Sequence, residues 1–195
     1  QLLTRVEALP GVRRAALVMV VPLGGRRGGN NVSVTTTGNP SEKQIVQVDW
    51  NVISPSYFET VGIPLVRGRA FTDFDREGAP AVVIVNEEWA RHFWPGQDPL
   101  GMRFAVGEHK TVQVVGVIRD GRFRNYRSAI SPCFYEPLAQ SYMGMMNLEV
   151  RTANDPLSLA QAVRREVQTL DKVSRISQIT TLESYRDAGL GPERM

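Results

Sequence analysis

Apolar and polar residues along this chain follow short periodic segments, each closed by proline, glycine or asparagine. Residues 2–9 carry apolar side chains at helical spacing and are predicted to be the end of an amphipathic helix that stops at Pro10. Residues 15–21 are all apolar and precede a proline, which favours a buried strand. Residues 32–35 and 45–48 alternate with a period of two and are predicted to be strands joined by a turn.

The next segments have strong cap and turn signals. Ser54 is predicted to cap a short helix that begins with a proline, carries Phe58 inward and ends at Gly62. The residues that follow, 63–71, are predicted to be extended. Residues 81–85 are an unbroken apolar run, which is typical of a buried strand.

A second helix is predicted after that strand. Asn86 is its expected N-cap, the two glutamates that follow suit the positive end of the helix dipole, and Pro95 ends it. Residues 112–118 are the clearest buried strand beyond this helix, and 133–135 is predicted to be a shorter one.

The residue pattern in the last third of the chain predicts a strand, a helix and a second strand. The first strand covers 147–152, and Asp155 opens a helix that runs to Leu170 with one apolar stripe. The second strand is predicted at 175–181.

The two ends of the chain share an apolar pattern. Val6, Leu9 and Val12 recur 161 residues later, in each case ahead of a predicted strand. So short a pattern arises either by chance or by duplication of a strand-helix-strand unit. If it is a duplication, both ends form one paired layer of an α+β fold, and the middle, 76–140, is an insertion with its own core.

Composition and charge narrow the function classes. The chain is 42% apolar and 22% charged, as in an ordinary globular protein. Its 23 Lys and Arg are scattered and nearly balanced by 20 Asp and Glu, so a nucleic-acid partner is not indicated. Cys133 is the single cysteine, which excludes an internal disulfide and a cysteine-rich metal site.

The longest apolar run, 15–21, has seven residues, whereas a membrane helix needs about 20. The chain is therefore not expected to span a bilayer by itself. Because the helical pattern already includes the first residues and no signal peptide is present, we expect the chain to be cut from a longer protein.

Candidate catalytic and ligand motifs are incomplete. The glycine and arginine loop at 24–29 lacks the spacing and the Lys-Ser/Thr pair of a phosphate-binding loop, which favours a surface loop. Glu88 and His92 could share a helix face as metal ligands, but no third ligand follows at a motif spacing. Asp73 and Asp75 resemble the start of a calcium loop that is out of register, which favours a capped turn.

Nucleophilic and nucleic-acid chemistry have less support. Arg122, Arg124 and Arg127 are interleaved with aromatic residues and could contact nucleic acid or anionic lipid, although a solvated loop explains them better. Cys133 follows a proline in an apolar run, where a buried and inert thiol is expected. We therefore predict a domain without catalytic residues, cofactor or metal.

Three longer strings carry the most specific signal. Residues 57–71 contain Tyr-Phe-x-Thr-x-Gly-Ile-Pro and Arg-Gly-Arg-x-Phe, residues 85–101 contain Val-Asn-Glu-x-x-Ala and Phe-Trp-Pro-x-x-Asp-Pro-Leu-Gly, and residues 114–121 read Val-Val-Gly-Val-x-x-Asp-Gly. With this spacing, the chain resembles the MacB-like periplasmic core domains of ABC transporter permeases of the FtsX-like type, closest to those abundant in acidobacteria.

This resemblance implies an α+β fold with two subdomains. A porter-like part containing a βαβ unit would comprise 1–75 and 141–195, and an inserted, sabre-like mixed α/β part would comprise 76–140. The domain would lie between two membrane helices of the permease, on the periplasmic side of the inner (plasma) membrane. It would not be an enzyme, since ATP hydrolysis belongs to a separate cytoplasmic ATP-binding subunit.

The resemblance also implies partners and a role. The partners are the permease's own transmembrane helices, the ATP-binding subunit and a second permease copy, with a periplasmic adaptor or lipoprotein as a further candidate, and no nucleic acid. The role is to transmit conformational change and to dock substrate or partner during export. The alternative is a binding module for a peptide, lipid or small hydrophobic molecule, with an apolar cleft lined by Trp89, Trp94, Phe123 or Tyr126.

The residues of the three strings are expected to shape turns, caps and cores, because glycine, proline and capping residues dominate them. They are Tyr57, Phe58, Gly62, Pro64, Gly68, Arg69, Phe71, Asn86, Pro95, Pro99, Gly101, Gly116 and Asp120.

Overall fold

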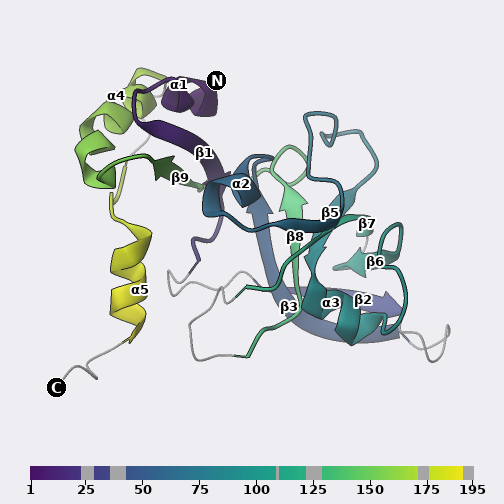
Figure 1. Cartoon of the computed structure of the whole chain (residues 1–195). Coiled ribbons are helices and arrows are strands. Elements are labelled where there is room, and N and C mark those ends of the chain that lie inside the picture. Colours follow the sequence, from purple (N-terminus) through teal and green to yellow (C-terminus); the bar gives the residue numbers. More distant parts are fainter. Residues whose placement is uncertain (23–28, 36–42, 109, 122–128, 171–175, 191–195) are drawn as a thin grey trace.

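The computed structural model in Figure 1 describes residues 1–22, 29–35, 43–108, 110–121, 129–170 and 176–190. Strands and helices follow one another irregularly, which confirms the predicted α+β class. In chain order the elements of these residues are α1 (Leu2–Glu7), β1 (Val12–Val18), β2 (Gly29–Thr35), β3 (Lys43–Ile53), α2 (Tyr57–Val61), β4 (Leu65–Gly68), β5 (Val82–Asn86), α3 (Glu87–Phe93), β6 (Arg103–Val106), β7 (Lys110–Ile118), β8 (Cys133–Pro137), β9 (Asn147–Thr152), the 3₁₀-helix η1 (Pro156–Leu159), α4 (Ala160–Leu170) and α5 (Leu182–Leu190).

Six strands pair in a closed circuit, the barrel. β2 pairs with β3 and β6, β6 with β7, β7 with β5, β5 with β8, and β8 with β3. The β3–β8 and β5–β7 ladders are parallel and the other four are antiparallel. Each of these strands therefore has a neighbour on both sides, which satisfies backbone groups that an open edge would expose.

The barrel and α3 enclose one hydrophobic core, the barrel core. Trp89 of α3 lies at its centre, with ring centroids 4.5 Å from Phe104, 4.7 Å from Phe93 and 5.7 Å from Phe134. The alternating residues of each strand supply the rest, as period-two patterning requires. The buried members are Val32, Val34, Val48, Val83, Val85, Trp89, Phe93, Trp94, Phe104, Val106, Val112, Val114, Val117 and Phe134.

Two strands, β5 and β8, are buried on both faces. In β5, Val83 and Val85 face the barrel core, while Val82 and Ile84 face a second hydrophobic core. Every residue of β8 is buried as well. The unbroken apolar run at 81–85 is explained by this position between two cores, since a strand with one solvent face would alternate.

The second core lies between β5, β8 and the helix α2. Its buried members are Ala16, Val18, Ile53, Tyr57, Phe58, Phe71, Val82, Ile84, Ile118, Cys133 and Tyr135. Cys133 is 5% exposed, which confirms the expectation of a buried thiol.

The barrel accommodates one buried charge. Glu136 of β8 is 3% exposed, and its carboxylate accepts a hydrogen bond from Trp50 Nε1 at 2.8 Å. The other oxygen pairs with Lys110 Nζ, which also donates to Ser141 Oγ at 2.9 Å. A buried carboxylate is tolerated when it has such partners.

Segments from the first and the last third of the chain form the terminal layer, defined as α1, β1, β9 and α4. β1 and β9 pair antiparallel, from Val12 opposite Thr152 to Val18 opposite Asn147. Figure 1 shows α1 and α4 together beside this pair, and Arg5 Nε donates to Glu166 Oε2 at 2.7 Å between the two helices.

Most predicted elements are present, and the strand expected at 15–21 is β1, displaced to Val12–Val18. Two predictions are wrong. Ser54 does not cap α2, whose N-cap is Ser56, because the Ser54 hydroxyl accepts the N–H of Leu17 at 2.9 Å.

The strand predicted at 175–181 is the other error. Residues 176–181 form no ladder, and α5 begins directly after them. Thr181 Oγ1 accepts the N–H of Ser184 at 3.1 Å, as an N-cap does. The pattern of apolar residues favours extended backbone, but a strand also needs a hydrogen-bonded neighbour, and in the described residues this segment has none. The second strand-helix-strand unit is therefore incomplete there.

The predicted division between 1–75 with 141–195 and 76–140 stays a prediction. The β3–β8 ladder crosses that division, and the barrel core takes residues from both sides of it. The loops at 24–29 and 122–127 lie outside the described residues, apart from Gly29 at the start of β2.

Candidate functional site

The structure brings the three strings of family-like residues together on one side of the barrel. β4, from the first string, pairs with β7, from the third, and places Gly68 opposite Gly116. The second string contacts both, because Gly101 N–H donates to Val114 O at 2.8 Å and Arg67 pairs with Asp98 at 2.7 Å. Segments far apart in the sequence thus form one unit, the string junction.

Glycine is required at the centre of the string junction. Gly68 has φ +74°, and a Cβ there would meet the Val115 carbonyl and lie 2.7 Å from Leu100 Cδ2 and 2.9 Å from Gly116 Cα. A Cβ on Gly116 would lie 2.5 Å from the carbonyl oxygen of Arg69. The two strands approach more closely than any side chain allows.

The prolines and the remaining glycine of the strings set turns. The carbonyl of Pro64 accepts the N–H of Arg119 at 3.0 Å, and that of buried Pro99 accepts the N–H of Met102 at 3.1 Å. Pro95 is exposed just beyond α3, and Gly101 has φ +83°. Pro64 thus holds the backbone between α2 and β4, and the other three residues shape the path between α3 and β6.

Arg69 and Asp75 hold the turn after β4. Arg69 donates to both carboxylate oxygens of Asp75, at 2.7 and 2.8 Å, and Thr72 N–H donates to one of them at 2.8 Å. The hydrogen bonds from Arg69 lower the pKa of Asp75. Phe71, 4% exposed, packs in the second core. Asp75 is thus part of a capped turn, as the sequence favoured.

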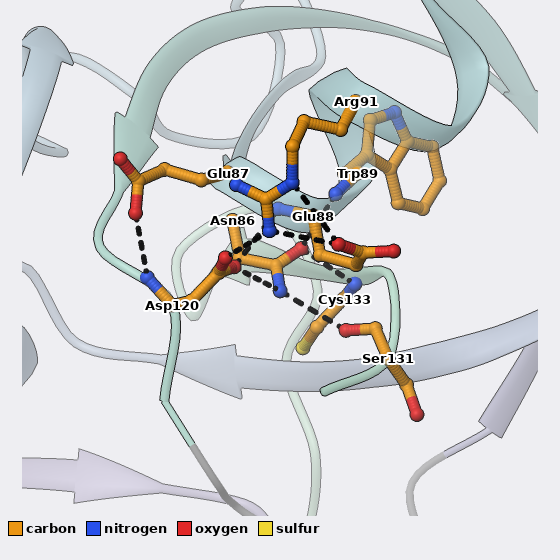
Figure 2. Close-up of polar contacts among 8 residues, drawn as sticks. All are labelled: Asn86, Glu87, Glu88, Trp89, Arg91, Asp120, Ser131 and Cys133. Carbon is orange, nitrogen blue, oxygen red and sulfur yellow. Dashed lines mark hydrogen bonds and ion pairs between the residues drawn. The ribbon is translucent and has the colours of Figure 1, made fainter. Parts of the chain in front are cut away.

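The Asn86 side chain links the start of α3, the segment that leads into β8 and the side chain of Asp120, as Figure 2 shows. Its Oδ1 accepts the N–H groups of Trp89, at 3.1 Å, and Cys133, at 2.9 Å. Its Nδ2 donates to Asp120 Oδ1 and to the carbonyl of Ser131, each at 3.0 Å. The side chain is fully buried with every amide hydrogen-bonding direction used, so the predicted N-cap also joins α3 to β8.

Asp120 completes this network. Its Oδ1 accepts the N–H of Glu88 at 2.8 Å, its Oδ2 pairs with Arg91, and its own N–H donates to Glu87 Oε2 at 3.1 Å. Arg91 also pairs with Glu88 at 2.7 Å. The carboxylates near α3 are occupied by groups of the protein, which suits a structural network better than acid–base or metal chemistry.

The residues considered as metal ligands do not form a metal site in the described part of the chain. Glu88 is paired with Arg91, and His92 is exposed with its ring edge-on to Phe93. His109 lies outside the described residues. In the part of the chain that the structure describes, no three histidine, cysteine, aspartate or glutamate side chains converge on a metal position.

A second unit, the α2 joint, connects the terminal layer to the barrel. β1 meets β3 at one register pair, Val18 opposite Ile53, and the N–H of Val20 donates to Asn51 Oδ1 at 3.0 Å. Short helix α2 then bridges from the end of β3 back over β1 and β9. Two backbone hydrogen bonds, from Met19 N–H to Val52 O and from Ser54 N–H to Leu17 O at 2.9 Å each, also link the layer to the barrel, and side-chain contacts of α2 add to this short connection.

Hydrogen bonds and an ion pair surround the α2 joint. Ser56 Oγ donates to the carbonyl of Ala15 at 2.7 Å, and Arg151 Nε donates to the carbonyl of Thr60 at 2.7 Å. Arg14 pairs with Glu59 at 3.0 Å. The guanidinium of Arg151 packs against the left-handed Gly62 that ends α2, where a Cβ would lie 2.7 Å from one of its nitrogens.

Aromatic rings fill the inside of the α2 joint. Tyr57 and Phe58 are 5.5 Å apart between ring centroids, and Tyr135 of β8 lies 6.1 Å from the first and 5.0 Å from the second. These rings fix α2 to the barrel wall. The family-like pair Tyr57-Phe58 therefore packs in the second core.

Beneath α2 lies a carboxylate that the sequence analysis did not single out. Glu149 of β9 is 8% exposed, and among the described residues neither of its oxygens has a hydrogen-bond partner. Burial raises its pKa from 4.5 to about 7. The Tyr57 hydroxyl is also buried without a partner there, and burial together with the charge of Glu149 raises its pKa.

A family model described as the MacB-like periplasmic core domain matches residues 1–170. The chain belongs to this family. It is therefore a MacB-like periplasmic core domain. In the described residues of this MacB-like domain, no helix has the length and apolar character to cross a membrane.

Solved structures show the same fold at low sequence identity. The periplasmic region of MacB from Actinobacillus actinomycetemcomitans is 14% identical, with a TM-score of 0.61 over 87% of this chain and 72% of that one. The extracellular domain of the noncanonic ABC-type transporter YknZ from Gram-positive bacteria is 17% identical, with a TM-score of 0.56 over 87% and 79%. A permease-protein domain from Porphyromonas gingivalis is 19% identical, with a TM-score of 0.52 over 94% and 71%. No curated protein matches the chain.

The side chains proposed to line an apolar cleft are packed where the structure describes them. Trp89 is fully buried and Trp94 is 3% exposed, both in the barrel core. Phe123 and Tyr126 lie outside the described residues. The two tryptophans therefore stabilise the barrel and do not form a ligand surface.

We predict that Gly68→Ala lowers the free energy of unfolding of this domain by about 3 kcal/mol, because it combines a left-handed backbone with steric overlap. The matched control is Gly78→Ala, since Gly78 has φ +83° and open space around its Cβ position. The control should lose about 1 kcal/mol, the backbone cost alone. Urea denaturation measures both, and equal losses would contradict the close approach of β4 and β7.

Asn86→Ala is predicted to cost about 3 kcal/mol, since it removes an N-cap and leaves the buried N–H of Cys133 without its acceptor. Asp155→Ala is the control, because Asp155 caps η1 through one exposed bond of 3.0 Å to Leu157 N–H. Its loss should be about 1 kcal/mol. Chemical denaturation of the two variants compares them, and a cost for Asn86→Ala no larger than the control would refute the connecting role.

Proposed function

We propose that this MacB-like domain is a non-catalytic mechanical element of its ABC permease. In this role it transmits conformational change between the membrane helices and the periplasm, and it docks substrate or partner during export. The observation that carries the proposal is the α2 joint. At this joint a small number of segments link the terminal layer to the barrel.

The contacts at the α2 joint suit transmission of force. The aromatic packing of Tyr57, Phe58 and Tyr135 resists compression, because interiors are close-packed. The bonds of Ser56 and Arg151 to backbone carbonyls oppose sliding of α2 along β1 and β9. Displacement of the terminal layer would thus be passed to the barrel as a whole.

The family resemblance supports a proposed set of partners. Energy would come from a cytoplasmic ATP-binding subunit and reach this domain through the permease's transmembrane helices. A second permease copy would provide the opposing surface, and a periplasmic adaptor or lipoprotein is a further candidate partner. The proposed division into a porter-like part, 1–75 with 141–195, and a sabre-like part, 76–140, would separate the segment next to the membrane from the docking segment.

The residues of the three strings support a role without chemistry. The side chains of Asn86, Asp120 and Asp75 form hydrogen bonds within the fold. Gly68 and Gly116 allow β4 and β7 to approach each other closely. Such residues specify shape and stiffness.

The test uses the full-length permease with its ATP-binding subunit, spin-labelled at cysteines that replace Thr4 in α1 and Gln97 in the turn after α3, both exposed. We expect the Thr4–Thr4 distance between two copies to change between the nucleotide-free and ATP-bound states. The distance from Thr4 to Gln97 within one copy should stay constant, since the domain would move as one body.

Labelled wild-type permease is the background control, because its native Cys133 is buried. A Thr4–Thr4 distance that is identical in both nucleotide states would refute the mechanical role. A change confined to the Thr4–Gln97 distance would refute movement of the domain as a single body.

A further inference from the structure

Glu149 stands out among the charged residues of the terminal layer because it is buried and its carboxylate has no hydrogen-bond partner among the described residues. Its position in β9, opposite Ala16 of β1, places it on the face of the layer that α2 covers. Arg14 and Arg151, which lie near it on β1 and β9, are engaged elsewhere, with Glu59 and with the carbonyl of Thr60. The polar groups of both arginines are therefore paired with other residues and not with the Glu149 carboxylate.

The other titratable groups around Glu149 also leave it uncompensated. From α2, Tyr57 faces it with a hydroxyl that is buried and has no partner among the described residues. Glu7 of α1 accepts the N–H of Ala15 and lies 4.0 Å from Arg14. Beyond Tyr57 lie Tyr135 and Cys133 of β8, which carry no positive charge. No cation of the described residues is paired with the Glu149 carboxylate.

We propose that Glu149 is a proton-operated latch, which holds α2 on β1 and β9 when it is protonated and loosens the α2 joint when it ionises. A neutral carboxylic acid tolerates burial against α2, whereas an unpaired carboxylate in the same place loses its hydration without compensation. Movement of α2 away from β9 would give the charge access to water. The latch would set how tightly the terminal layer is coupled to the barrel.

The direction of the pH effect follows from the two states. With α2 closed, Glu149 has a pKa of about 7, and when it is exposed the pKa returns to about 4.5. Below the lower value both states hold the proton, so pH has no effect through this group. As pH rises between the two values the open state loses its proton first, so opening becomes easier, and the effect levels off above the higher value.

The test is amide hydrogen exchange of the 195-residue chain between pH 5.5 and 8, with the intrinsic pH dependence of exchange divided out. Protection of α2 and of the β1–β9 ladder should fall about 25-fold over this range, while that of β5 and β7 in the barrel stays constant. In Glu149→Gln the protection of α2 should be nearly independent of pH, because the amide does not ionise.

Two further variants keep the result interpretable. Glu149→Met also removes the acid at similar volume and replaces Glu149→Gln if that variant does not fold. Glu59→Gln is the matched control, since Glu59 is an exposed carboxylate on the same helix, and it should keep the pH dependence of the wild type. A pH dependence that persists in the Glu149 variants would overturn the proposal. So would an equal fall in barrel protection, because ionisation would then act on the whole fold.

This proposal goes beyond the mechanical role of the domain. Its test needs neither the permease nor nucleotide, so the latch and the mechanical role can fail separately.

Discussion

The fold depends on two strands that are buried on both faces. β5 and β8 form the wall between the barrel core and the second core, and their side chains contribute alternately to each. Because Val82 and Val85 pack on opposite sides, a change in one core is transmitted to the other through a single layer of backbone. The position of Asn86 at the end of β5 extends this wall into α3, and its hydrogen bond to the N–H of Cys133 ties α3 to the start of β8.

Many polar side chains in this domain form hydrogen bonds or ion pairs that join one structural element to another. Asp120 and Asn86 join β7, α3 and β8, whereas Arg69 and Asp75 close the turn that follows β4. Buried polar groups that satisfy one another give a backbone one well-defined arrangement at little net gain in stability. Glu149 is the contrast, a buried acid whose oxygens have no partner among the described residues.

Much of the candidate site could be predicted from local patterns, and the rest could not. The cap at Asn86, the stop at Gly62 and the burial of Tyr57 and Phe58 all follow from residue type and spacing. The sequence offered no signal for Glu149, because Asn147, Glu149 and Arg151 alternate with Leu148 and Val150 as on a solvent-facing strand. Helix α2, which comes from about 90 residues earlier in the chain, covers Glu149 on that polar face, while Asn147 and Arg151 stay exposed. Alternation assigns residues to two faces of a strand and does not determine which face another element will cover.

The amino-acid sequence by itself determined the α+β class, the bounds of most elements to within a few residues, and the family, because caps, proline and glycine signals and the three strings are local features of the chain. Tertiary structure alone decided the closure of the barrel, the approach of Gly68 to Gly116 and the absence of a ladder at residues 176–181. Each of these depends on pairing between segments far apart in sequence, which a local pattern permits but does not specify. A strand exists only when a neighbour accepts its hydrogen bonds, and the whole fold supplies that neighbour.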